Sequence, residues 1–280
     1  MQIITSIQEL SDSLAWRRHA KSVGLVISKG NLHRGHRTLI ETSQAACDMT
    51  VVTTFSGTEL FAQDRALQPA EPVEQNEALL EEMGVNMLFA PPFEELYPQN
   101  FAHRTKVALP RIDCNALGGA ERTHCQESVT LALKLCNIIA PTLLVLGEKH
   151  YQQLHLTERA LADLNHPTRV RRVPVVRETD GLLTASDNHL LSADQRKGAR
   201  LLYQTLNDIG HALLSGARHF DKLEQTARIA LRGGHFQTEY VAICDDHTLM
   251  PPTPETSAFR ILGAASLGAV RLADNIYAQA

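Results

Sequence analysis

The sequence lacks the features that mark membrane, secreted and nucleic-acid-binding proteins. Its apolar runs are far too short to span a bilayer. The N-terminus, Met1-Gln2-Ile3-Ile4, has no charged region followed by an apolar core, so we expect no signal peptide. The net charge of -4 is mild, with no basic excess and no acidic tail. We therefore expect a cytoplasmic protein that binds neither membranes nor nucleic acid.

Cysteine is sparse, and the five cysteines have no spacing typical of disulfide pairs or metal sites. We expect reduced thiols, as in most cytoplasmic proteins. Internal repeats and low-complexity tracts are absent from the sequence. The 280 residues suffice for one large domain or two smaller ones with a substantial core.

Apolar runs alternate with helical patterns through most of the chain. The runs predict strands at 23–27, 50–55, 85–90, 142–146 and 169–176. The periodic segments predict helices at 6–21, 74–83, 127–139 and 151–164 and one from Arg34 onward, whereas 94–121 shows no clear period. This alternation is typical of right-handed β-α-β units, and it predicts an α/β fold with a Rossmann-like parallel sheet and helices on both faces.

The pattern changes from about Asp194. Two predicted helices, 194–215 and 220–231, precede short alternating runs at 239–243 and 261–265. We therefore predict a smaller α+β C-terminal domain that acts as a lid. The expected domains are 1–177, which binds a nucleotide, and 178–280, with a hinge near 175–181.

Two histidines, His33 and His36, lie between the first predicted strand and its helix. The N-terminus of a helix presents unpaired N–H groups and a positive dipole end, which suit an anion. Histidines three residues apart share one face and can donate hydrogen bonds to phosphate oxygens. Gly35 leaves room for a flat ring beside the backbone. The pattern indicates a site for nucleotide phosphates.

The alternatives for this histidine pair are an ordinary surface pair or a structural zinc site. No cysteine or carboxylate lies nearby at ligand spacing, so zinc is the weaker alternative and we predict no protein metal site. Ligands of parallel sheets bind beyond the carboxyl ends of the strands. The polar segments that follow the strands, 29–36, 56–61, 147–153 and 177–188, should therefore converge on one cleft.

Taken in order, these motifs resemble the pantothenate synthetase (pantoate–β-alanine ligase) family, a group of His-x-Gly-His nucleotidyltransferases. The matching segments are 30–36, 89–91, 95–98, 134–138, 147–154, 177–181, 188, 191–192 and 267–276. They extend over nearly the whole chain. The resemblance also implies a homodimer.

The resemblance implies ligation of an acid to an amine in two steps. The carboxylate of an acid such as pantoate attacks the α-phosphorus of ATP, and pyrophosphate leaves. An amine such as β-alanine then attacks the acyl carbon of the adenylate, and AMP leaves. This chemistry needs positive charge, alignment of the reactants and exclusion of water. ATP and Mg²⁺ are the implied cofactors, and the acid and the amine are the implied small-molecule partners.

The resemblance also implies roles for individual residues. His33 and His36 would hold phosphates, and Lys149 would neutralise charge that develops at the α-phosphate. The implied ATP-binding residues are Lys29, Gly30, Gly147, His150, Val176 and Ser186. The implied substrate-binding residues are Gln153, Ser56, Gly57, Leu60 and Arg122.

The sequence departs from the family pattern at several of these positions. Asp187 stands where the family has a phosphate-binding arginine, and Ala185 lacks a hydroxyl group. Lys29 replaces a methionine, and we hypothesise that its charge compensates in part for Asp187.

The acid pocket differs as well. Gly57 and Leu60 replace the asparagine and glutamine that contact pantoate in the family, and His150 replaces an aspartate that contacts ribose. Three functions remain open at this point. They are a ligase acting on pantoate or a related acid, a diverged paralogue with another acid or acceptor, and a non-catalytic nucleotide-binding protein.

Overall fold

The computed structural model describes residues 1–15, 21–28, 32–54, 73–98, 104–109 and 119–280. The chain forms two compact units. The N-terminal unit comprises Met1–Leu109 with Thr123–Pro174, and the C-terminal unit comprises Pro110–Arg122 with Val175–Ala280. The domain boundary predicted at 177/178 stays a prediction.

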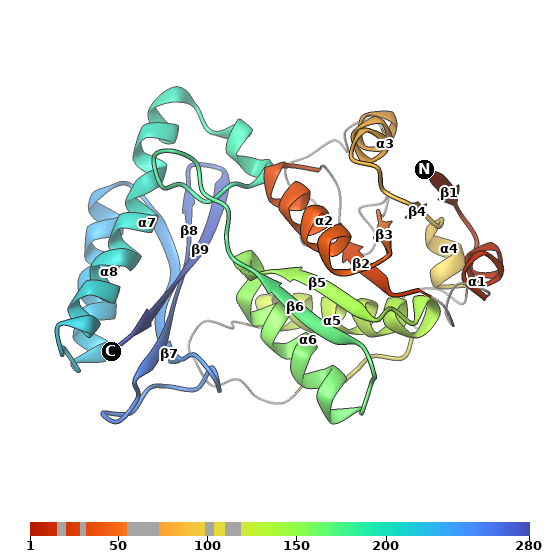
Figure 1. The fold of residues 1–280 in the computed structure, drawn as a ribbon. Helices are drawn as coiled ribbons and strands as arrows, with labels where there is room; N and C mark the ends of the chain where they lie inside the picture. Colours follow the sequence, from red (N-terminus) through yellow and green to blue (C-terminus); the bar gives the residue numbers. More distant parts are fainter. Residues whose placement is uncertain (16–20, 29–31, 55–72, 99–103, 110–118) are drawn as a thin grey trace. The chain divides into compact units, whose positions relative to one another are not determined.

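The N-terminal unit is built on a six-stranded parallel sheet, shown in Figure 1. Its strands are β1 (Gln2–Ile4), β2 (Val23–Ile27), β3 (Met49–Thr53), β4 (Met87–Phe89), β5 (Leu143–Gly147) and β6 (Arg169–Val173). Their order across the sheet is β1-β4-β3-β2-β5-β6, and all neighbouring pairs are parallel. This confirms the predicted α/β class.

The helices of this unit follow from the strand order. They are α1 (Ile7–Ala15), α2 (Arg34–Ala46), α3 (Val73–Glu82), α4 (Phe93–Leu96), α5 (Gly119–Ile139) and α6 (Tyr151–Asp163). Right-handed crossovers that run from β2 toward β4 put α2 and α3 on one face, and crossovers that run from β4 toward β6 put α5 and α6 on the other. On the first face, Ile40 of α2 and Leu80 of α3 pack with Val26 and Val52.

The strand order reverses between β2 and β5. The chain leaves β2 in one direction across the sheet, through α2 to β3, whereas β5 pairs with the other side of β2 and continues to β6. In open α/β sheets, such a reversal opens a crevice beyond the carboxyl ends of the two strands. The segments that follow β2 and β5 carry the predicted histidine pair and Lys149.

The C-terminal unit contains an antiparallel sheet of three strands in the order β7-β8-β9. The strands are β7 (Gln237–Asp245), β8 (Ala258–Leu267) and β9 (Val270–Gln279). Two long helices, α7 (Ala193–Leu214) and α8 (Phe220–Gly233), pack on this sheet, with α7 on β8 and β9 and α8 on β7. Leu206, Leu231 and Ile261 share their apolar core. This agrees with the predicted α+β class.

Side chains of α8 bind the backbone of the edge strand β7. Glu224 accepts a hydrogen bond from the Ile243 amide at 2.8 Å, and Arg228 donates to the Val241 carbonyl at 2.9 Å. The two side chains also form an ion pair, at 3.6 Å. Burial raises the pKa of Glu224.

The predicted elements match the structure closely at most boundaries. The strands β1 and β9 and the short helix α4 were not predicted, and α5 begins at Gly119 rather than at 127. The strand β6 ends at Val173, three residues earlier than predicted, because Pro174 has no N–H to continue a ladder. Ser6 caps α1 as predicted, since its hydroxyl accepts from the Glu9 amide.

Four of the five cysteines fall in the part of the chain that the structure describes, and none of these four is paired. The fifth, Cys114, lies outside it. Among the described residues, we find no helix with the length and apolar character needed to cross a bilayer.

We predict that Gly24→Ala destabilises the N-terminal unit. A Cβ atom at Gly24 of β2 would lie 2.1 Å from the Ser43 hydroxyl of α2, which is held by a buried hydrogen bond of 2.8 Å to Thr50. Such overpacking typically costs about 1–3 kcal/mol. Urea unfolding measures the change, and Gly233→Ala is the control because its Cβ would meet nothing within 4 Å. Equal stability of the two variants would contradict this packing.

Candidate active site

The predicted catalytic residues lie at the reversal point of the parallel sheet. His33 and His36 stand at the start of α2, which follows β2, and Lys149 stands in the short helix η2 (Glu148–His150), which follows β5. The rings of the two histidines are 4.2 Å apart, centroid to centroid. Burial lowers the pKa of both rings, and the nearby charge of Lys149 lowers each pKa further. The structure therefore brings these three side chains together.

His33 is the N-cap residue of α2. Its Nδ1 accepts a hydrogen bond of 3.0 Å from the Gly35 amide, and its own amide donates to Nδ1 of His36 at 3.3 Å. Together these bonds form a capping box made of two imidazoles. A Cβ on residue 35 would lie 2.8 Å from Cε1 of His33, so the ring occupies the room that glycine leaves.

These bonds determine the protonation of both rings. A nitrogen that accepts a hydrogen bond carries no proton, so the Nδ1 atoms of His33 and His36 are unprotonated. A neutral imidazole then bears its proton on Nε2. Burial is the main cause that lowers the pKa of His33 to about 4 and that of His36 to about 3. Both rings are therefore neutral at pH 7, and each presents an Nε2–H donor.

The two donors have different surroundings. Nε2 of His36 lies 3.4 Å from the hydroxyl of Ser28, a fully buried residue that directly follows β2 and whose amide donates to the Thr53 carbonyl. We did not single out Ser28 in the sequence, although its place between the apolar strand and the histidines was a usable signal. Nε2 of His33 forms no hydrogen bond within the part of the chain that the structure describes. His33 is thus the better placed of the two to bind a ligand.

Within this group of three side chains, the positive charge comes from Lys149, because the imidazoles are neutral. The amides at the start of α2 contribute less than predicted. The Gly35 amide is bonded to the His33 ring, and the His36 amide donates to the His33 carbonyl at 2.8 Å. The arrangement can offer one ammonium group and neutral N–H donors to a phosphate chain, which is a suitable combination for an anion that gains charge during reaction.

Other predicted site residues lie near this group in the fold or belong to the other unit. Gly147 ends β5, His150 is exposed at the end of η2, and Gln153 lies in the first turn of α6. Val176, Ser186 and Arg122 belong to the C-terminal unit. The predicted residues Lys29, Gly30, Ser56, Gly57 and Leu60 lie outside the described residues.

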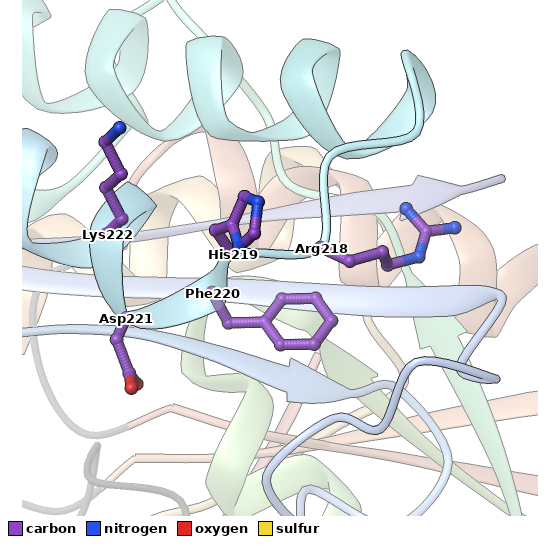
Figure 2. Close-up of a pocket in the computed structure, with 5 residues that line it drawn as sticks. All are labelled: Arg218, His219, Phe220, Asp221 and Lys222. Atoms are coloured by element: carbon purple, nitrogen blue, oxygen red, sulfur yellow. The ribbon is translucent and has the colours of Figure 1, made fainter.

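A separate hollow of about 400 Å³ lies in the C-terminal unit (Figure 2). Its lining residues are Arg218, His219, Phe220, Asp221 and Lys222, at the junction of α7 and α8. None of the residues predicted from the sequence lines it. The guanidinium group of Arg218 donates to the carbonyls of Leu213 and Ala217 and lies over the ring of Phe259, which indicates a structural role.

The lowered pKa values predict a pH dependence of stability. The unfolded chain takes up protons on these histidines as the pH falls below about 6.5. The folded chain resists this until the pH approaches about 4 for His33 and about 3 for His36. The stability that the neutral rings contribute is therefore complete above pH 6.5 and is lost between pH 6.5 and 3. Thermal unfolding followed by circular dichroism should show Tm falling over this window.

A comparison of variants separates this effect from that of other groups. The variant His36→Asn should show a smaller fall of Tm between pH 6.5 and 3 than the parent. The control His219→Asn changes an exposed histidine of the other unit and should show the same fall as the parent. An identical pH profile for the parent and His36→Asn would contradict a neutral, buried His36.

The chain is similar to known proteins over nearly its whole length. A family model described as pantoate-beta-alanine ligase matches residues 2–277. The pantothenate synthetase of Pseudomonas savastanoi pv. phaseolicola is 34% identical over 280 residues, which cover 99% of each chain. The pantothenate synthetase of Azotobacter vinelandii is 36% identical over 279 residues, which cover 99% of this chain and 98% of the relative.

Solved structures give the same result. The crystal structure of pantothenate synthetase from Thermus thermophilus has a TM-score of 0.85 and 33% identity, with 99% of each chain covered. The pantoate-beta-alanine ligase of Francisella tularensis, crystallised with beta-gamma ATP and beta-alanine, has a TM-score of 0.77 and 24% identity over 99% of this chain and 97% of that one, and so shares the fold. On this evidence, the chain belongs to the pantoate-beta-alanine ligase family.

Proposed function

We propose that this protein is an ATP-dependent ligase that joins pantoate to β-alanine through an acyl-adenylate. Membership of the family supports the reaction class. The observation that carries the assignment of the site is the meeting of His33, His36 and Lys149 at the reversal point of the parallel sheet. A phosphate chain bound there would contact one cation and the Nε2–H groups.

In the first step, a carboxylate oxygen of the acid attacks the α-phosphorus of ATP. A new P–O bond forms between the α-phosphorus and the acid while the P–O bond to pyrophosphate breaks. Pyrophosphate leaves with the electron pair of the broken bond. Negative charge grows on the α-phosphate oxygens and on the leaving group. Lys149 stabilises that charge, and the Nε2–H of His33 donates a hydrogen bond to a phosphate oxygen. Since the Gly35 amide holds the His33 ring in place before substrate binds, this donor needs little reorganisation.

In the second step, the amine attacks the acyl carbon of the adenylate. A C–N bond forms, the C–O bond to AMP breaks, and the attacking nitrogen passes its proton to a phosphate oxygen of the departing AMP. The adenylate is a mixed anhydride that water can hydrolyse, so the site must exclude water at this stage. We assign contact with the acid to Gln153 of α6, and contacts with ATP to Gly147, His150, Val176 and Ser186.

Magnesium enters this proposal as part of the substrate MgATP. Among the described residues, we find no group of three histidine, cysteine or acidic side chains that could hold a metal ion. Mg²⁺ usually binds substrate phosphates and water and takes few ligands from the protein. The homodimer and the cytoplasmic location remain predictions.

Two departures from the family pattern, Gly57 and Leu60, bear on which acid is used, whereas Asp187 bears on the phosphates. Asp187 lies in the short helix η3 (Ser186–Leu190) of the C-terminal unit, next to Ser186. A polar substrate that leaves buried groups unmatched can lose about 10⁴-fold in discrimination. The choice of acid is therefore the part of the proposal that most needs an experiment.

We expect the protein to catalyse ATP–pyrophosphate exchange that depends on pantoate. The assay follows labelled pyrophosphate into ATP with pantoate and with a panel of other small hydroxy acids. Exchange with another acid alone would indicate a paralogue, and a complete lack of exchange and of ATP binding would contradict ligase function. A His36→Ala variant should abolish the exchange and serves as the negative control.

A second prediction separates the two roles of His33. Asparagine is a favourable N-cap residue, so His33→Asn can keep an acceptor for the Gly35 amide while it removes the Nε2–H donor. We expect unfolding stability within about 1 kcal/mol of the parent and a loss of about 10²–10³ in kcat for adenylation.

Steady-state exchange kinetics and urea unfolding test this in parallel. His219→Asn, at the N-cap position of α8, where no side-chain cap bond is formed, is the matched control. A fully active His33→Asn variant would show that the His33 ring acts only as a helix cap.

A further inference from the structure

A short hairpin in the C-terminal unit joins two of the proposed ATP contacts. Residues 177 and 183 form an antiparallel bridge, and the Thr184 amide donates to the Val176 carbonyl at 2.9 Å. The Thr184 hydroxyl donates to Glu178 at 3.0 Å and closes the hairpin across its two arms. Val176 begins the hairpin, and Ser186 lies two residues beyond its end. The placement of the hairpin therefore determines where both of these residues lie.

Arg177 holds this hairpin on the edge strand β9. Its guanidinium group makes two parallel bonds to Asp274, at 2.7 and 2.9 Å. It also donates to the carbonyls of Gly181, at 3.1 Å, and Asn275, at 3.2 Å. It lies over the ring of Tyr203 in α7, 4.2 Å from the ring centroid. A single side chain thus connects the hairpin turn, the strand β9 and the helix α7.

The ion pair is largely buried. The side chain of Arg177 is 18% exposed and that of Asp274 is 3% exposed. The carboxylate also accepts a hydrogen bond from the backbone, because the Asn275 amide donates to Oδ1 of Asp274 at 2.7 Å. A planar guanidinium group with fixed donors can impose such a geometry, whereas an ammonium group cannot.

The Arg177–Asp274 ion pair contributes more to the position of the hairpin than to the free energy of unfolding. Removing two charges from water is costly, and buried ion pairs can often be replaced by neutral residues with no loss of stability. The hairpin also has apolar attachment, since Leu182 and Leu191 lie in the core with α7 and the sheet. The apolar contacts suffice to attach the segment, but a fixed fork of hydrogen bonds is needed to set its position.

We propose that Arg177 and Asp274 are positioning residues, which fix the place of the hairpin and of the following residues Ala185–Ser186 within the C-terminal unit, and with it the two proposed ATP contacts, Val176 and Ser186. This inference rests on the proposed function, because it concerns the use of the same nucleotide. It adds that the geometry of these ATP contacts is set by an ion pair that does not itself touch the nucleotide.

The test uses the full-length double variant Arg177→Met with Asp274→Asn. This variant leaves no unpaired buried charge and keeps an oxygen that can accept from the Asn275 amide. We expect Tm close to that of the parent but faster hydrogen–deuterium exchange in peptides that cover residues 176–188. We also expect the KM for ATP in pyrophosphate exchange to rise about tenfold or more, since displacements of about 1 Å have large kinetic effects, with a smaller change in the KM for the acid.

The opposite edge of the same sheet offers a matched control. Glu224 and Arg228 form an ion pair and bind the backbone of β7, as Arg177 binds that of β9. The double variant Glu224→Met with Arg228→Met should leave both the hydrogen–deuterium exchange of residues 176–188 and the KM for ATP unchanged. Arg177→Lys tests the fork itself, because it keeps the charge and should still raise the KM for ATP.

The outcomes are distinguishable. Unchanged hydrogen exchange in 176–188, or an unchanged KM for ATP in a folded double variant, would overturn the positioning role. An equal effect of the control variant would show a general loss of stability and would also overturn it. If the parent shows no ATP–pyrophosphate exchange with any acid, the proposed function fails. Hydrogen–deuterium exchange still decides whether the Arg177–Asp274 pair holds the hairpin.

Discussion

The hydrogen bond from the Gly35 amide to Nδ1 of His33 is the interaction on which the candidate active site depends. It makes one imidazole both the cap of a helix and a member of the site. The ring is oriented when α2 forms, because the same bond caps the N-terminus of the helix and fixes the tautomer of the ring. The second bond of the capping box does the same for His36. Formation of the helix therefore also fixes the orientation of these two imidazoles.

Much of the fold could be predicted because the apolar runs and the helical periods agree along most of the chain. The prediction of β2 is correct to the residue, and α2 begins at Arg34 as expected. Where the prediction was wrong, local sequence conflicted with tertiary structure. Asp274 and Asn275 lie side by side within β9 and interrupt its alternation, so this strand was missed. Their polarity makes sense only with Arg177 and Arg260 in place, which lie on other elements of the unit, and Arg177 is also far away in sequence.

The grouping of site residues could be predicted in outline but not in detail. The rule that ligands bind beyond the carboxyl ends of parallel strands placed Lys149 near the histidines, and the structure has them together. The neutrality of the rings could not be predicted because it depends mainly on burial, and the position of their protons depends on which backbone amides point at Nδ1. The contact of Ser28 with His36 depends on the register of β2 against α2, which one sequence does not define.

The binding of α8 to β7 has a consequence for how the protein behaves beside other chains. A bare strand edge invites an extended segment of a neighbouring polypeptide to add to the sheet, which is a common first step of aggregation. Such a segment would find the Ile243 amide and the Val241 carbonyl already bonded to Glu224 and Arg228. To add there, it would have to displace a charged pair rather than water. The helix thus blocks the addition of a strand at these two positions of β7.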